Sequence, residues 1–139
     1  MMQRAQSPAG DEIFLRLEDG EDLLGSLAEL GVEAGLAWGI GMLREVRLGY
    51  WTGSGYEEHR LDEPAELLSL QCNFSLKEGK PFPHCHAVLS RRDGAVLGGH
   101  LLAATVHAGN EIYVRRLSGI ALERVQEPSG LWGLRPQSR

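Results

Sequence analysis

The sequence predicts a single β-rich domain with one main helix. Its 139 residues are enough to bury one hydrophobic core, and no internal repeat is evident. Eighteen glycines and an aromatic content of 6% indicate many turns and close backbone approaches rather than a helical bundle. Most apolar segments alternate with a period of two, and only one segment carries a clear helical stripe.

The first elements follow from periodicity. Residues 1–10 have none and are expected to be disordered. Residues 12–17 alternate between apolar and polar and predict a strand. Residues 21–30 predict the helix, because two acids open its first turn, leucines form an apolar stripe and Gly31 ends it.

Further strands are predicted where apolar residues alternate or run together between glycines. Gly39-Ile40-Gly41 lacks the lysine and following helix of a phosphate loop, so a tight turn or close packing is expected there. The domain is expected to span residues 11–127, and 128–139 to form a C-terminal tail. The expected strands cover residues 36–43, 45–52, 56–61, 68–76, 83–89, 95–106, 111–116 and 120–125.

Three of the five histidines lie close together, in a predicted hairpin. His84 and His86 are two residues apart and therefore project from one face of a strand. Arg92-Asp93-Gly94 has the composition of a common three-residue hairpin loop, which would place His86 opposite His100. A loop of another length, or a bulge at Gly98-Gly99, would turn His100 to the other face.

Three neutral histidines would hold zinc or another divalent metal and leave the fourth position open for water or substrate. In the alternative interpretation they are hydrogen-bonded core residues or line a subunit contact. Cys85 points to the opposite face and is expected to be a small buried residue rather than a fourth ligand.

A polar row on the strand 68–76 would face a cleft or, alternatively, solvent. This row comprises Ser69, Gln71, Asn73 and Ser75.

Composition bears on location and partners. The net charge of −5 and the presence of only two lysines argue against tight DNA binding, which needs a basic face.

Cys72 and Cys85 lack a Cys-x-x-Cys spacing and no secretory segment is recognised, so reduced thiols in a cytoplasmic protein are expected. No apolar stretch is long enough for a membrane span. The hairpin is apolar on both faces, so a partner subunit is expected to cover it.

Short motifs spread over residues 12–125 occur in an order that resembles the PPC domain (plants and prokaryotes conserved; domain of unknown function 296). The motifs are Gly39-Ile40-Gly41-x-Leu43, Leu48-Gly49-Tyr50, Glu66-Leu67-Leu68-Ser69-Leu70, His84-Cys85-His86 and Gly94-x-Val96-x-Gly98-Gly99-His100-Leu101. The resemblance implies an α+β fold with a mainly antiparallel sheet, assembled as a homotrimer with sites near the subunit interfaces. Stand-alone bacterial members are often labelled as predicted DNA-binding proteins.

In plants the domain follows AT-hook motifs, which hold the DNA, and this sequence has no Arg-Gly-Arg-Pro hook. Direct DNA binding is therefore not expected. The resemblance assigns metal or small-ligand binding to His84, His86 and His100. Glu111, on a later strand, is a weaker candidate for a partner of these histidines or a proton acceptor.

Three functions follow from these observations. The first is a trimeric PPC protein that binds a divalent metal, with a regulatory or ligand-sensing role and at most indirect association with DNA. The second is an enzyme that activates water at an open zinc site, for which no substrate can be named. The third is a purely structural oligomerisation module. A cupin is a less favoured fold, because Ser90 and Arg91 stand where cupins place a glutamate and Ala104 replaces their asparagine.

Overall fold

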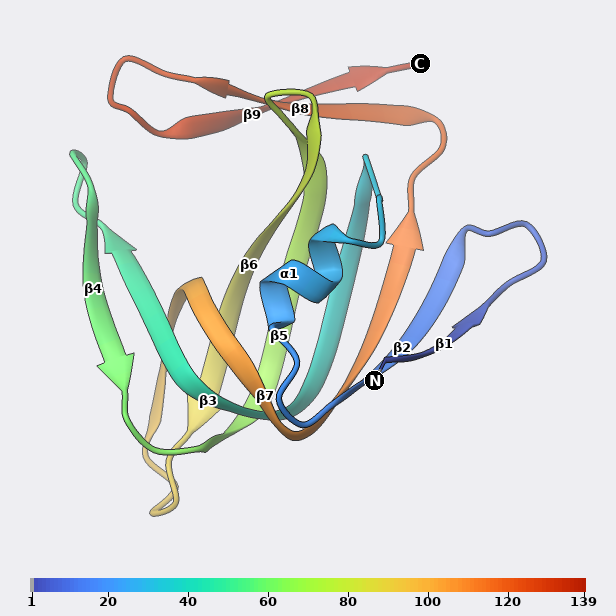
Figure 1. Ribbon diagram of the computed structural model, residues 1–139. Coiled ribbons are helices and arrows are strands. Elements are labelled where there is room, and N and C mark those ends of the chain that lie inside the picture. The colour runs from blue at the N-terminus through green and yellow to red at the C-terminus, as the bar shows by residue number, and fades with distance from the viewer. Residues whose placement is uncertain (1) are drawn as a thin grey trace.

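Nine strands form one strongly curved sheet in the computed structural model, which describes residues 2–139 (Figure 1). The paired strands are antiparallel except for β5 and β8, which run parallel. The β-rich architecture with one helix is therefore confirmed. The elements are β1 (Gln3–Gln6), β2 (Glu12–Glu18), α1 (Leu23–Ala28), β3 (Gly35–Trp51), β4 (Tyr56–Leu61), β5 (Ala65–Lys77), β6 (Lys80–Ser90), β7 (Val96–Arg116), β8 (Ile120–Gln126) and β9 (Trp132–Ser138).

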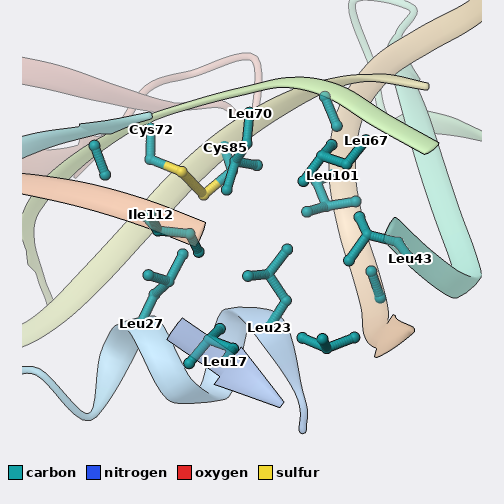
Figure 2. Close-up of a cluster of buried hydrophobic side chains, with 14 of the residues drawn as sticks. Leu17, Leu23, Leu27, Leu43, Leu67, Leu70, Cys72, Cys85, Leu101 and Ile112 are labelled. Atoms are coloured by element: carbon teal, nitrogen blue, oxygen red, sulfur yellow. A yellow bond between two sulfur atoms is a disulfide. The ribbon is translucent and has the colours of Figure 1, made fainter. Parts of the chain in front are cut away.

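Four of the strands close into a ring. β3 pairs with β5, β5 with β6, β6 with β7, and β7 again with β3. The helix lies inside the curve of the sheet (Figure 1), and its Leu23 and Leu27 are fully buried against leucines of the strands (Figure 2). Because alternate residues of each strand point inward, the neighbouring side chains of the same strands lie on the outer surface.

The helix is shorter than predicted. Asp22 is extended and forms an isolated bridge with Thr105, so the residues expected to open the helix belong to the chain that enters it. The Asp22 carboxylate then caps the helix by accepting a hydrogen bond from the Gly25 backbone N–H at 3.2 Å. Two of the predicted strand pairs are instead single long strands, β3 and β7.

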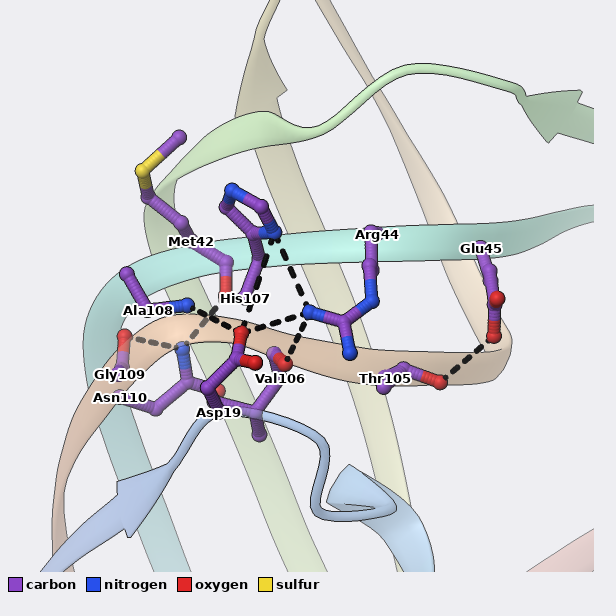
Figure 3. A network of polar contacts seen from close by, with 10 residues as sticks. All are labelled: Asp19, Met42, Arg44, Glu45, Thr105, Val106, His107, Ala108, Gly109 and Asn110. Carbon is purple, nitrogen blue, oxygen red and sulfur yellow. Dashed lines mark hydrogen bonds and ion pairs between the residues drawn. The ribbon is translucent and has the colours of Figure 1, made fainter.

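The long strands bend where a non-glycine residue has a positive φ. In β7 this residue is Ala108, with φ of 63°, and its backbone N–H donates to the Asp19 carboxylate at 2.9 Å. The amide Nδ2 of the buried Asn110 donates to the Met42 carbonyl of β3 at 2.9 Å (Figure 3). Polar side chains from β3, β7 and the turn after β2 therefore hold the bend in place (Figure 3).

Close packing explains Gly39 and Gly41. A Cβ on Gly39 would lie 2.6 Å from the Glu111 carbonyl oxygen of β7, and one on Gly41 would overlap the Gly109 carbonyl oxygen. The expectation of close packing at this pair is confirmed, since β3 and β7 approach each other directly there.

Both ends of the chain differ from expectation. Residues 1–10 were expected to be disordered, yet Gln3–Gln6 form β1 on the edge of β2. The expected tail 128–139 contains β9, which pairs with β8. All four residues of β1 are exposed, and β9 is at most half-buried, so neither strand needs the apolar alternation by which strands are predicted.

The expectation of reduced thiols is wrong for this structure. Cys72 and Cys85 are directly opposite each other on β5 and β6, with their Cα atoms 4.1 Å apart, and they form a disulfide inside the core (Figure 2). Their register follows from the two-residue turn Glu78-Gly79, in which both residues have positive φ.

Among the described residues, no helix has the length and apolar character needed to cross a membrane.

Candidate metal centre

The β6–β7 hairpin has the predicted register. His86 lies opposite His100, and the pairing continues without a bulge to Ser90 and Val96. The Arg91 backbone N–H donates to the Ala95 carbonyl at 2.8 Å, which closes the three-residue loop. The sequence-based hypothesis that both arms of the hairpin present histidines on one face is therefore confirmed.

The three imidazoles converge on the outer face of the sheet. The ring centroids of His84 and His100 are 4.9 Å apart, those of His84 and His86 are 5.1 Å apart, and those of His86 and His100 are 5.7 Å apart. One ring nitrogen from each histidine lies within 4.8 Å of the other two. His86 is exposed, whereas His84 and His100 are half-buried. This spacing and donor set suit a tetrahedral divalent ion such as zinc.

The surroundings keep two of the rings neutral. Burial lowers the pKa of His84 to about 4, with a further contribution from the positive charge of Arg124. Burial likewise lowers the pKa of His100 to about 4, with His86 and Arg124 as additional causes. A neutral imidazole is the form that binds a metal, so these two rings are ready to act as ligands at neutral pH.

We expect the metal-free protein to lose stability as the pH falls from 6.5 to 4. An unfolded histidine has a pKa of about 6.5, so in this window the unfolded chain binds more protons than the fold does at His84 and His100. The contribution of these two rings is constant above the window and levels off below it. Urea unfolding of chelator-treated protein across this pH range measures the slope.

A double variant, His84→Gln with His100→Gln, is the control for this slope. It should unfold with less pH dependence between 6.5 and 4, because the two depressed pKa values are gone. Carboxylates are common to both proteins, so their contribution to the slope cancels in the comparison. An equal slope in the double variant and the parent would contradict the neutral state of the two rings.

Arg124 and Tyr56 lie outside the hairpin and contact the histidines. Arg124 of β8 also donates a hydrogen bond at 2.9 Å to the side-chain oxygen of Asn73, the β5 residue that lies opposite His84. The same Arg124 nitrogen, Nη2, lies 2.9 Å from His84 Nδ1. On the other side, the Tyr56 ring stacks on the His100 ring with a centroid separation of 4.4 Å. The polar row of β5 thus contributes Asn73 to the site.

Comparison with known proteins gives the family. The model of the Plants and Prokaryotes Conserved domain, abbreviated PCC or PPC, matches residues 4–118. The chain belongs to this family. The resemblance drawn from the sequence motifs is therefore confirmed for the PPC domain, and no curated protein matches the chain.

Solved structures with the PPC fold are similar over almost the whole chain. A PPC protein from Pyrococcus horikoshii is 33% identical, with 95% of this chain and 92% of that chain covered and a TM-score of 0.84. A protein from Archaeoglobus fulgidus described as metal-containing is 34% identical, with 95% and 97% covered and a TM-score of 0.79. A protein from Ralstonia eutropha described as a putative DNA-binding protein is 26% identical, with 94% of each chain covered and a TM-score of 0.83.

One residue predicted for the site of this PPC domain lies outside it, and two residues that were not predicted belong to it. Glu111 lies in the other half of β7, opposite Arg16 and Ile40, and lines neither cavity that contains the histidines. Arg124 and Tyr56 were not predicted. Arg124 reaches the histidines only through the parallel pairing of β5 with β8, which no local pattern indicates. Tyr56 belongs to the predicted strand 56–61, whose residues are mostly polar.

Proposed function

We propose that this PPC protein is a homotrimer in which each chain binds one divalent metal, zinc, through His84, His86 and His100. The observation that carries the proposal is that three ring nitrogens lie within 4.8 Å of one another on the β6–β7 hairpin. The Archaeoglobus fulgidus relative supports it, because it is described as metal-containing. The proposed role is regulatory or ligand-sensing, with at most indirect association with DNA.

Exposed apolar side chains support the trimer. Large apolar residues are exposed on the outer face of the isolated chain, where Trp38 is 52% and Ile40 55% accessible on β3. Val96, at the loop end of the histidine hairpin, is 60% accessible. Apolar surface that recurs along one face is typical of a protein–protein contact. Neighbouring copies of the chain would cover it.

The DNA and enzyme alternatives have less support. The net charge of −5 disfavours direct DNA binding even though the Ralstonia eutropha relative is described as putatively DNA-binding. Among the described residues, no aspartate or glutamate lines either cavity next to the histidines, so an enzyme that activates water would lack a carboxylate for proton transfer.

Metal analysis of the purified protein together with its mass in solution tests the proposal. We expect one zinc ion per chain after zinc addition and removal of excess metal, and a mass of three chains. A chelator should remove the zinc without unfolding the chain, since the core and the hairpin form around apolar side chains. Absence of tightly bound zinc, cobalt or nickel would overturn the metal assignment, and a monomeric mass would overturn the trimer.

A further inference from the structure

A cavity of about 350 Å³ opens directly beside the histidines. His84 and His100 form part of its wall, so a molecule bound there would lie next to a metal on the histidines. Apart from two leucines and two glycines, the rest of the wall consists of four aromatic and two basic side chains, and no acidic one. The aromatic and basic residues are Trp51, Tyr56, Phe82, Trp132, Lys77 and Arg124.

The aromatic side chains of the cavity form two groups, one that continues onto His100 and one around Lys77. Trp51 and Tyr56 meet edge to face with a centroid distance of 5.2 Å, and Tyr56 continues as a stack on His100. Lys77 Nζ lies 4.7 Å from the Phe82 ring centroid and 4.8 Å from that of Trp132. A cavity lined by several aromatic rings and a few polar groups is typical of a site for a small aromatic molecule.

The two basic side chains have no acidic partner. Among residues 2–139, no carboxylate forms an ion pair with Lys77 or Arg124. Arg124 Nη1 donates to the Trp132 carbonyl at 3.0 Å, while its buried Nε has no hydrogen-bond partner. Burial also lowers the pKa of Arg124. A half-buried guanidinium without a counter-ion is costly, and an anion in the cavity would supply one.

The contact between Arg124 and His84 conflicts with metal binding. A guanidinium only donates hydrogen bonds, so His84 Nδ1 must accept from Arg124 Nη2 with its lone pair. A metal-bound neutral imidazole has one nitrogen on the metal and a proton on the other. In either orientation Nδ1 has no free lone pair, so a metal on His84 deprives Arg124 of this acceptor and places two cations side by side.

We propose that the cavity binds a small aromatic carboxylate whose carboxylate group lies between Arg124 and the metal on the histidines, so that metal and anion bind cooperatively. This inference rests on the proposed metal function. The carboxylate replaces His84 as the acceptor for Arg124, and its planar shape matches the fork of the guanidinium. The negative charge of the carboxylate lies between the guanidinium and the metal. The aromatic ring of the ligand lies against the aromatic side chains of the cavity. Lys77 adds a second positive charge to the cavity.

The test compares 1-naphthoate with the neutral isostere 1-naphthamide by calorimetric titration of the zinc-loaded protein. We expect naphthoate to bind at least about 10-fold more tightly than naphthamide, and this preference to fall after removal of zinc with a chelator. By thermodynamic linkage, naphthoate should raise the affinity for zinc by the same factor by which zinc raises the affinity for naphthoate.

Arg124→Met removes the charge and the donors while keeping an unbranched apolar side chain about as long as the aliphatic stem of arginine. We expect this variant to lose the preference for naphthoate over naphthamide. In the absence of any carboxylate it should bind zinc more tightly than the parent, because Arg124 no longer competes for His84 Nδ1. Loss of packing alone would not raise zinc affinity. The matched control is Arg92→Met in the exposed hairpin loop, which should behave like the parent in both assays.

The outcomes separate this inference from the proposed function. Stoichiometric zinc without a preference for the carboxylate, or with the same preference in Arg124→Met, would overturn the inference and leave the metal function intact. Absence of zinc binding would overturn both. The comparison of the two naphthalene probes on the unaltered protein decides the inference even if Arg124→Met does not fold.

Discussion

Replacing His86 by alanine should lower the affinity for zinc by at least about 100-fold, because it removes one of three direct ligands. Loss of a residue that only hydrogen-bonds to a ligand already costs about 10- to 100-fold. His86 is exposed, so the substitution should leave the fold and the stability almost unchanged. Competition with a coloured chelator of known zinc affinity measures the loss, and circular dichroism together with the mass in solution reports on the fold and assembly.

His59→Ala is the matched control for His86→Ala. His59 is also an exposed strand histidine, but it lies on β4 and faces Glu57 at 3.6 Å rather than the other imidazoles. This variant should bind zinc like the parent. If His86→Ala retained parental zinc affinity, the metal centre would have to be formed by other residues and the proposed function would be wrong.

Gly98→Ala should disturb the whole hairpin. A Cβ at this position would lie 2.7 Å from the Ala87 carbonyl oxygen and 3.4 Å from the Val88 Cα of β6, and neither backbone atom can move without shifting the strand. Such overpacking costs about 1–3 kcal/mol of unfolding free energy. Because the two arms must separate, His86 and His100 should also move apart and zinc affinity should fall by about 10-fold or more.

Gly119→Ala provides the comparison for Gly98→Ala. Gly119 has no atom within 4 Å of the added Cβ and no positive φ, so alanine should be accepted there without loss of stability or zinc. Urea unfolding and zinc competition on the two variants separate a local clash from a general effect of losing glycine. Parental behaviour of Gly98→Ala in both assays would show that the close approach of β6 and β7 does not set the geometry of the site.

The histidine hairpin could be predicted from the sequence because its register depends on a single short loop. Gly94 has the positive φ, 88°, that the last position of this loop requires, and its place fixes every pair between β6 and β7. The same reasoning applied to Glu78-Gly79 would have placed Cys72 opposite Cys85. The cysteines were instead judged by their spacing along the chain, which carries no information on register.

The rest of the site depends on contacts between segments far apart in the sequence. Arg124 comes to the histidines through two parallel pairs between β5 and β8, and Trp132 arrives on the strand after that. Neither position stands out locally, because β8 and β9 are short and largely exposed. Strand alternation shows which face a residue occupies within its own hairpin, but not which distant strand will lie beside it.

The position of Cys85 between His84 and His86 isolates sulfur chemistry from metal chemistry. Consecutive strand residues project to opposite sides, so the cysteine sulfur lies in the interior while both flanking imidazoles face outward. A thiolate could not join the coordination sphere of an ion on these imidazoles without inverting the strand. Reductants and oxidants should therefore act on the cysteine pair without affecting the metal site. Chelators should remove the ion without affecting the disulfide.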